Sequence, residues 1–137
     1  AGTVNAAGAV GLHAAIDYIY KVGFDVIQSR ELALTRRVME GMDKLPHVHI
    51  LGSDRPEEHH GIVTFTVDGV HPHDISEILA SDGIAIRAGH HCAQPLLAHL
   101  GRPSAARASF AFYNTEAEAD RLVECISAIR GRMGYGA

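Results

Sequence analysis

The sequence predicts an α+β domain: a small, largely antiparallel sheet of a few strands with helices packed on one face, and a helical segment at the N-terminus. Three observations support this prediction. Apolar residues recur at helical spacing early in the chain, β-branched runs occupy its middle, and an amphipathic helix pattern closes it. A chain of 137 residues, 47% of them hydrophobic, is long enough for one compact domain.

The stretch from Ala6 to Leu45 is predicted to be helical. Its apolar residues follow the spacing of one helix face and are Leu12, Ile16, Ile19, Ile27, Leu34, Val38 and Leu45. Gly23, with Asp25 as a capping residue after it, indicates that one helix ends and a second begins there. We interpret residues 1–45 as a helical lead-in and residues 46–137 as a small domain.

Two strands are predicted to follow. Val48–Leu51 is short, whereas Ile62–Val67 is β-branched and aromatic, with Val63, Phe65 and Val67 on one face. The polar residues between the two runs are typical of a loop. Alternation in the second run predicts a strand with one buried face.

A helix is predicted from Pro72 to Ser81, with Ile75, Ile78 and Leu79 facing inward. Asp82-Gly83 provides the turn that ends it. Ile84–Ile86 is then predicted to be a short strand. This strand would deliver the chain directly into the segment Arg87 to Pro95.

The last part of the chain is predicted to form a helix, a strand and a second helix. The first helix runs from Pro95 to Leu100 and is ended by Gly101-Arg102-Pro103. Apolar and polar residues alternate from Arg107 to Phe112, which is typical of a strand. Thr115 and Glu118 have the spacing of a capping box at the start of the closing helix. Its apolar stripe consists of Ala119, Leu122, Ile126 and Ile129.

Composition and charge exclude several classes of partner. The formal net charge is −4 and no run of basic residues occurs, so neither nucleic acid nor an anionic membrane surface is expected to bind. Two cysteines, Cys92 and Cys125, and no secretory segment indicate a reducing, cytoplasmic compartment. Because the chain begins at Ala1 without an initiator Met, we expect it to be a piece of a longer protein.

Cys92 is the candidate nucleophile. A cysteine reacts through its thiolate, which nearby positive groups favour, and Arg87, His90 and His91 are residues of that kind. His90 and His91 are also candidates for proton transfer. Turn residues on both sides of Cys92 predict a loop position. Without further information, a buried apolar thiol is an equally good interpretation of Cys92. For Cys125, beside the apolar stripe of the last helix, a core position is expected.

The histidines around Cys92 and the arginine at position 107 are two further candidates for a binding site. His90, His91, Cys92 and His99 carry zinc-ligand chemistry, but consecutive residues cannot easily converge on one ion, so no metal site is expected. Arg107 is compatible with a surface ion pair of little energetic weight or with bidentate binding of a carboxylate. The sequence pattern alone leaves both roles of Arg107 open.

Residues 87–96, Arg-Ala-Gly-His-His-Cys-Ala-Gln-Pro-Leu, resemble the active-cysteine segment of SufS-type, or group II, cysteine desulfurases, members of the class V aminotransferase family. The resemblance extends over nearly the whole chain, through Arg107-Ala108-Ser109, Tyr113-Asn114-Thr115, and the opening Ala1–Asn5 with Gly8 and residues 14–18. It implies the C-terminal domain fold of fold-type I pyridoxal-phosphate enzymes, with residues 1–45 leading in from a large domain that this chain lacks.

The resemblance also implies an activity and roles. Cys92 would take the sulfur atom of L-cysteine, or the selenium atom of L-selenocysteine, and alanine would be released. Arg107 would hold the substrate carboxylate, Arg87 would act electrostatically near the persulfide, and Thr3 would reach the phosphate of pyridoxal phosphate in the neighbouring subunit of a homodimer. Val4 replaces the proline that is usual in the family.

The partners implied are L-cysteine and a sulfur-acceptor protein of iron–sulfur cluster assembly. The family's cofactor lysine lies upstream of the residues present, and neither Lys21 nor Lys44 lies in a matching motif. The chain alone is therefore expected to be inactive. A selenocysteine lyase, a non-enzymatic thiol carrier and a purely structural or dimerisation domain are the alternatives.

Overall fold

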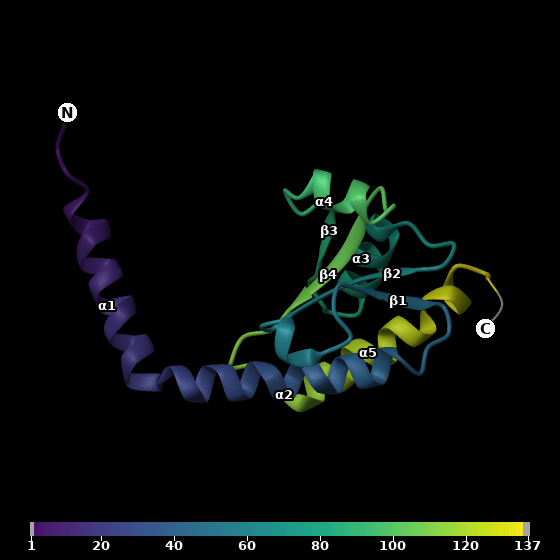
Figure 1. Ribbon diagram of the computed structural model, residues 1–137, viewed down its shortest axis with the longest axis horizontal. Coiled ribbons are helices and arrows are strands. Elements are labelled where there is room, and N and C mark those ends of the chain that lie inside the picture. The colour runs from purple at the N-terminus through teal and green to yellow at the C-terminus, as the bar shows by residue number, and fades with distance from the viewer. Residues whose placement is uncertain (1, 136–137) are drawn as a thin grey trace.

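The computed structural model describes residues 2–135. In chain order the elements are α1 (Ala6–Val22), α2 (Phe24–Met42), β1 (Val48–Leu51), the 3-10 turn η1 (Pro56–Glu58), β2 (Ile62–Val67), α3 (Pro72–Ser81), β3 (Arg87–Gly89), α4 (Gln94–His99), β4 (Ala105–Ser109) and α5 (Glu116–Arg132). This order and the two layers that it builds confirm the predicted α+β fold (Figure 1).

The strands form one antiparallel sheet in the order β1-β2-β4-β3. Val63 and Phe65 of β2 are buried, as predicted from their alternation, while Ile62 and Thr64 face the opposite side. Ala108 pairs with Val63, and Arg107 pairs with Thr64. Because side chains alternate along a strand, β4 divides its residues between the core and the opposite face.

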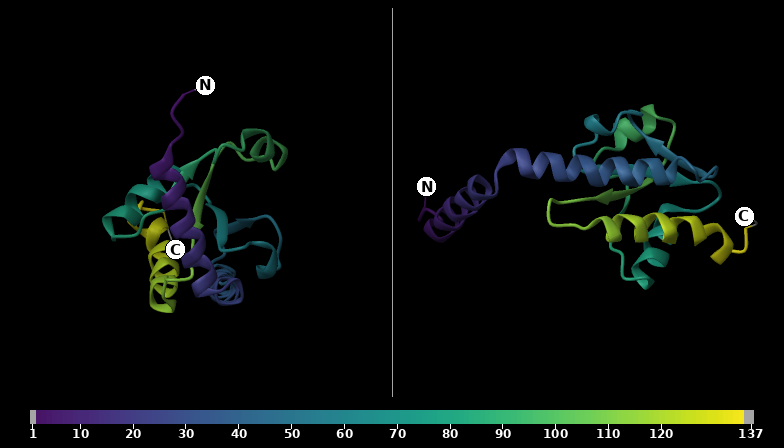
Figure 2. Two further views of the ribbon diagram at one scale, coloured as in Figure 1. Left: turned by 90° about the vertical axis from the view of Figure 1, so that its left-hand side faces the viewer. Right: turned by 90° about the horizontal axis from the view of Figure 1, so that it is seen from below.

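The core lies between one face of the sheet and the helices α2, α3 and α5 (Figures 1 and 2). The buried residues that meet there include Leu34, Val38, Met42, Phe65, Ile75, Leu79, Ala106, Leu122, Ile126 and Ile129. Short α4 is set apart from these helices, with its Leu96 and Leu97 beside residues of the opposite sheet face. The prediction that the main helices cover one face of the sheet is confirmed.

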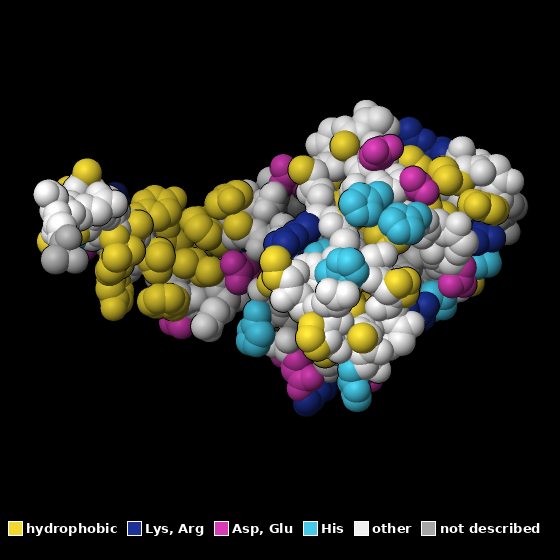
Figure 3. All heavy atoms as spheres, turned by 90° about the horizontal axis from the view of Figure 1, so that it is seen from above, with side chains coloured by type: hydrophobic (Ala, Val, Ile, Leu, Met, Phe, Trp, Pro, Cys, Tyr) yellow, Lys and Arg dark blue, Asp and Glu magenta, His cyan; other side chains and the backbone are white. Residues whose placement is uncertain are grey.

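Helix α1 carries the predicted apolar stripe but contributes no buried side chain. It projects from the sheet as an arm (Figure 1), and hydrophobic side chains gather along it (Figure 3). Leu12 is 63% exposed and Ile16 is 42% exposed. An apolar face of this kind is covered in a folded protein, so α1 marks a surface that requires a packing partner.

The two long helices are separated at Gly23, where φ is 92°. This left-handed conformation is open to glycine at little cost, which explains the break at the predicted position. The predicted capping role of Asp25 is wrong, because Gly23 itself occupies the cap position and no side chain bonds there. Asp25 lies in the first turn of α2, where a carboxylate interacts favourably with the helix dipole.

Helix α2 packs as part of the compact unit. Its Leu34, Val38 and Met42 are fully buried against the sheet and α5. The predicted boundary between residues 1–45 and 46–137 remains a prediction for a longer protein. Within residues 2–135, α1 lies outside the buried core, which is formed by residues that follow Gly23.

The predicted strand at Ile84–Ile86 is wrong, since the third strand lies at Arg87–Gly89. The backbone N–H of Ile84 donates to the carbonyl of Leu79, which keeps this stretch at the end of α3. A cavity of about 420 Å³ lies between residues 82–86 and residues 108–110, and both segments line it. The two segments therefore do not pair until Arg87 is reached.

The predicted strand from Arg107 to Phe112 is displaced as well. Strand β4 begins at Ala105 and ends at Ser109, and Phe110 donates its backbone N–H to Gly61 beyond the end of β2. The Phe112 ring instead lies near Tyr18, in a tilted arrangement with centroids 6.4 Å apart, and near Tyr113, edge to face with centroids 5.4 Å apart. Aromatic contact with α1 thus replaces strand pairing at this end.

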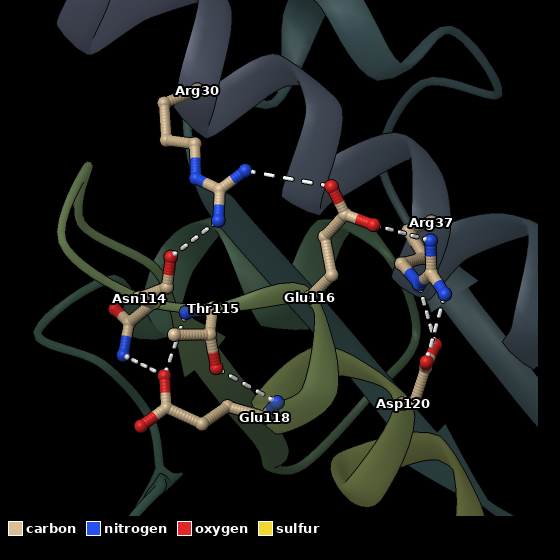
Figure 4. A network of polar contacts seen from close by, with 7 residues as sticks. All are labelled: Arg30, Arg37, Asn114, Thr115, Glu116, Glu118 and Asp120. Atoms are coloured by element: carbon tan, nitrogen blue, oxygen red, sulfur yellow. Dashed lines mark hydrogen bonds and ion pairs between the residues drawn. The ribbon is translucent and has the colours of Figure 1, made fainter.

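Polar contacts join the start of α5 to α2 (Figure 4). Arg37 donates to both carboxylate oxygens of Asp120 and to Glu116, which also accepts from Arg30. The guanidinium of Arg37 lowers the pKa of Asp120. These exposed ion pairs contribute little individually and mainly fix the angle between the two helices.

The predicted capping box is present at the start of α5. The Thr115 hydroxyl accepts from the backbone N–H of Glu118 at 3.2 Å, and the Glu118 carboxylate accepts from the backbone N–H of Thr115 at 2.7 Å. The hydrogen bond from the Thr115 backbone and a second one from the Asn114 side-chain amide lower the pKa of Glu118. Deprotonated Glu118 therefore favours the folded helix start.

We expect Phe65→Ala to lower the free energy of unfolding by about 3–5 kcal/mol, because it opens a cavity in the middle of the core. Ile62→Ala is the matched control in the same strand on the opposite face, with an expected loss below about 1.5 kcal/mol. Urea unfolding followed by circular dichroism measures both. Equal losses would contradict the assignment of the two faces.

We expect Glu118→Gln to weaken the pH dependence of stability in the acid range. Because the folded-state pKa of Glu118 lies below its unfolded value of about 4.3, its contribution is present above that pH and is lost as the pH falls through the folded value. Urea midpoints measured between about pH 3 and about pH 6 test this. Thr115→Ala is the comparison: it should lower stability by about 1 kcal/mol across the range. Identical pH profiles for Glu118→Gln and the parent would contradict the expectation.

Candidate functional site

Cys92 is exposed, in the loop that connects β3 to α4. This loop lies at the side of the sheet away from α2 and α5 (Figure 1). The thiol is therefore available to a partner molecule. Of the two interpretations of Cys92, burial as an apolar residue is excluded.

The backbone at Cys92 forms a tight left-handed turn. His91 and Cys92 have φ values of 55° and 58°, and the backbone N–H of Ala93 donates to the carbonyl of His90 at 2.9 Å. Positive φ at two successive central residues is typical of turns that favour glycine or asparagine. For other residues the conformation costs about 1 kcal/mol or more each, so surrounding contacts must hold it.

Arg87 contacts the thiol directly. Its Nη2 atom donates to the Cys92 Sγ atom at 3.2 Å. Arg87 lies on β3, opposite Arg107 on β4, so both guanidinium groups project from the same face of the sheet. The Cys92 sulfur therefore lies beside a positive charge, which would stabilise negative charge that develops on it during a reaction.

Arg107 is half-buried and makes no ion pair within residues 2–135; its Nε atom is buried and without a hydrogen-bond partner there. It lines a pocket of about 390 Å³ on the sheet face away from the core, together with Thr64, His90 and His91. The apolar lining consists of Leu51, Gly52, Ile62, Ala93, Leu96, Leu97 and Leu100. No acidic residue is among these lining residues, so Arg107 is available to an anionic ligand.

The two histidines occupy different surroundings. His90 is exposed and lines the same pocket as Arg107. The Nε2 atom of His91 lies 2.9 Å from the carbonyl oxygen of Ala105. Burial lowers the pKa of His91, and the nearby charge of Arg107 acts in the same direction. His91 is thus favoured as a neutral ring.

The other predicted residues do not join this cluster. Cys125 is 4% exposed in the core, as expected, and burial raises the pKa of its thiol. Thr3 is exposed and precedes α1. In the described part of the chain, no group of three or more His, Cys, Asp or Glu residues could hold a metal ion. No helix there is long and apolar enough to cross a membrane.

Several features of the site were not predicted. The pairing of Arg87 with Arg107 was missed because the strand was placed three residues too early, which left Arg87 in a loop. The pocket wall formed by Thr64 and Leu96 was also missed. The outward position of Thr64 in the alternating strand was the available signal. The bond from His91 to Ala105 joins residues 14 positions apart and has no sequence signature.

Comparison with known proteins relates this site to a family. Residues 1–122 match the family model for aminotransferase class-V. The chain is 42% identical over 134 residues to a probable cysteine desulfurase of Streptomyces coelicolor, covering 98% of this chain and 32% of that protein. The chain spans about a third of the length of the curated relatives it matches.

Solved structures agree in fold. The apo structure of a cysteine desulfurase from Thermococcus onnurineus superposes with a TM-score of 0.91 at 40% identity, covering 96% of this chain and 33% of that chain. The cysteine desulfurase CsdA of Escherichia coli, in an S-sulfonic acid form, superposes with a TM-score of 0.86 at 36% identity. The match covers 96% of this chain and 32% of that chain. A structure of C-DES with glycine covalently linked to its PLP cofactor is more distant, with a TM-score of 0.57 at 25% identity. The match covers 72% of this chain and 23% of that chain.

Proposed function

The chain belongs to the aminotransferase class-V family, and on that premise we propose that it is the C-terminal part of a cysteine desulfurase that converts L-cysteine to L-alanine. The observation that carries the proposal is the exposed Cys92 thiol, 3.2 Å from the Arg87 guanidinium. The names of the relatives support the activity. The segment from Arg87 to Leu96 supports the SufS-type, group II, subclass.

Pyridoxal phosphate is the proposed cofactor of the whole protein, supported by the PLP bound to the relative C-DES. Its proposed contribution is to withdraw electrons from bound substrate, which makes the substrate sulfur open to attack. No lysine lines the pocket that contains Arg107, and Lys21 and Lys44 are exposed on or beside the long helices. The residues present therefore fit the substrate side of such a site, and the covalent lysine is assigned to the rest of the protein. Thr3 is proposed to contact the phosphate across a homodimer.

The residues of this chain have separable tasks in the proposed reaction. Arg107 holds the α-carboxylate of cysteine through its planar guanidinium, in a pocket lined by no acidic residue. The Cys92 thiolate attacks the substrate sulfur; a sulfur–sulfur bond forms and the carbon–sulfur bond breaks. The electron pair remains on carbon, which takes up a proton to give alanine. Arg87 stabilises negative charge on the Cys92 sulfur before and after transfer.

The persulfide on Cys92 is proposed to pass to an acceptor protein for iron–sulfur cluster assembly or other sulfur transfer. The exposure of the thiol supports this step, because an acceptor can reach it. A cytoplasmic location is also proposed. Its support is that Cys92 and Cys125 are both free, as they would be in a reducing compartment.

Three alternatives lead to different results. A selenocysteine lyase would turn over L-selenocysteine in preference to L-cysteine. A thiol carrier would acquire a persulfide on Cys92 only when a separate desulfurase is supplied, and Arg107 would have no substrate to bind. A structural or dimerisation domain would not require Cys92 for activity.

We expect Cys92→Ser in the full-length protein to reduce alanine formation from L-cysteine by at least about a hundredfold, because the hydroxyl is a far weaker nucleophile. Mass spectrometry of the parent should show one extra sulfur on Cys92. Arg107→Lys is the contrasting variant: it keeps the thiol and the charge but should raise KM, since bidentate binding is lost. Full activity of Cys92→Ser would leave the structural-domain alternative.

We expect the 137-residue chain by itself to form no alanine from L-cysteine, because the covalent lysine is assigned to the rest of the protein. Incubation of the purified chain with pyridoxal phosphate and L-cysteine, followed by amino-acid analysis, measures this. The full-length protein is the positive control. Alanine formed by the chain alone at a rate comparable to the control would overturn this expectation.

A further inference from the structure

His91 makes a contact that the proposed reaction does not use. Its Nε2 atom lies 2.9 Å from the carbonyl oxygen of Ala105, and a carbonyl oxygen only accepts, so Nε2 carries the proton. Its Nδ1 atom is buried without a hydrogen-bond partner in the described residues. Burial, the largest effect, and the adjacent arginines lower the pKa of His91. The ring is thus a neutral donor fixed in one orientation.

The bond is made from a turn whose backbone conformation is uncommon. His91 and Cys92 both have positive φ, which is rare for residues other than glycine and which histidine adopts more readily than cysteine. The bond from Ala93 to the His90 carbonyl closes the turn locally. The bond from His91 to Ala105 is the contact that connects this turn to a distant strand.

The acceptor occupies a rigid position in the site. Ala105 is fully buried, begins β4 and pairs with Gly89 of β3. Arg107 lies two residues further along β4 and points to the same face, because strand side chains alternate. The His91 bond therefore links the turn that carries the thiol to the strand that carries the carboxylate-binding residue.

We propose that His91 is a positioning residue: its hydrogen bond to the Ala105 carbonyl holds the left-handed turn of residues 91 and 92 and sets the place of the Cys92 sulfur relative to Arg87 and Arg107. The role in catalysis rests on the proposed function. The role in placing the sulfur beside Arg87 does not.

Three substitutions separate the hydrogen bond from the backbone preference. His91→Ala removes the donor. His91→Gln retains an amide N–H at about the reach of Nε2, whereas His91→Asn favours the left-handed backbone but has a side chain too short to reach Ala105. His99→Ala, an exposed histidine of α4 outside the pocket, is the matched control.

The first measurement is the rate of Cys92 alkylation by iodoacetamide at pH 7 in the full-length protein without substrate. We expect a severalfold decrease for His91→Ala and His91→Asn, because the sulfur leaves the Arg87 guanidinium, and a rate near that of the parent for His91→Gln and His99→Ala. Recovery by Asn but not by Gln would overturn the proposal, since backbone preference alone would then explain the effect. An unchanged rate in all three would overturn it as well.

The second measurement is steady-state alanine formation by the holoenzyme. His91→Ala should lower kcat about 10- to 100-fold with KM for L-cysteine nearly unchanged, because the nucleophile is misplaced while Arg107 is intact. His91→Gln should restore most of kcat. A raised KM with unchanged kcat would overturn the catalytic part. If the parent forms no alanine, the proposed function fails, and the alkylation series alone decides whether His91 positions the sulfur.

Discussion

Strand β4 is the constraint on which both the core and the site depend. It pairs with β2 on one side and β3 on the other, so alternate residues serve opposite faces. Ala106 and Ala108 face the helices, and their small side chains allow α3 to approach the sheet. Ala105 and Arg107 lie on the opposite side of the strand, where Arg107 lines the pocket. A shift of one residue in its register would exchange the two sets and abolish both core and site.

The parts of the fold that were predicted correctly are those with local signals. Ile62–Val67 alternates, Thr115 and Glu118 have capping spacing, and Gly23 supplies the break between the long helices. The misplaced strands failed for a non-local reason. Ile84–Ile86 has the composition of a strand, but the bond from Ile84 to Leu79 keeps it at the end of α3. Pairing with a distant segment decides such cases, and composition does not report it.

The residues of the site were predicted more completely than the geometry in which they are arranged. The resemblance assigned Cys92, Arg87 and Arg107, and the structure adds the contact of Arg87 with the thiol and the pocket around Arg107. His91 was considered only as support for the thiolate or for proton transfer. Its bond to Ala105 could not be predicted, because it depends on where β4 begins, and that position was itself predicted two residues too late.

The opposed arginines have a thermodynamic consequence. Like charges facing each other across neighbouring strands oppose the pairing of β3 with β4. Negative charge on the Cys92 sulfur would offset one of these charges, and a bound carboxylate would offset the other. An occupied pocket should therefore tighten the edge of the sheet, so that ligand affinity and the resistance of this region to local opening become linked quantities.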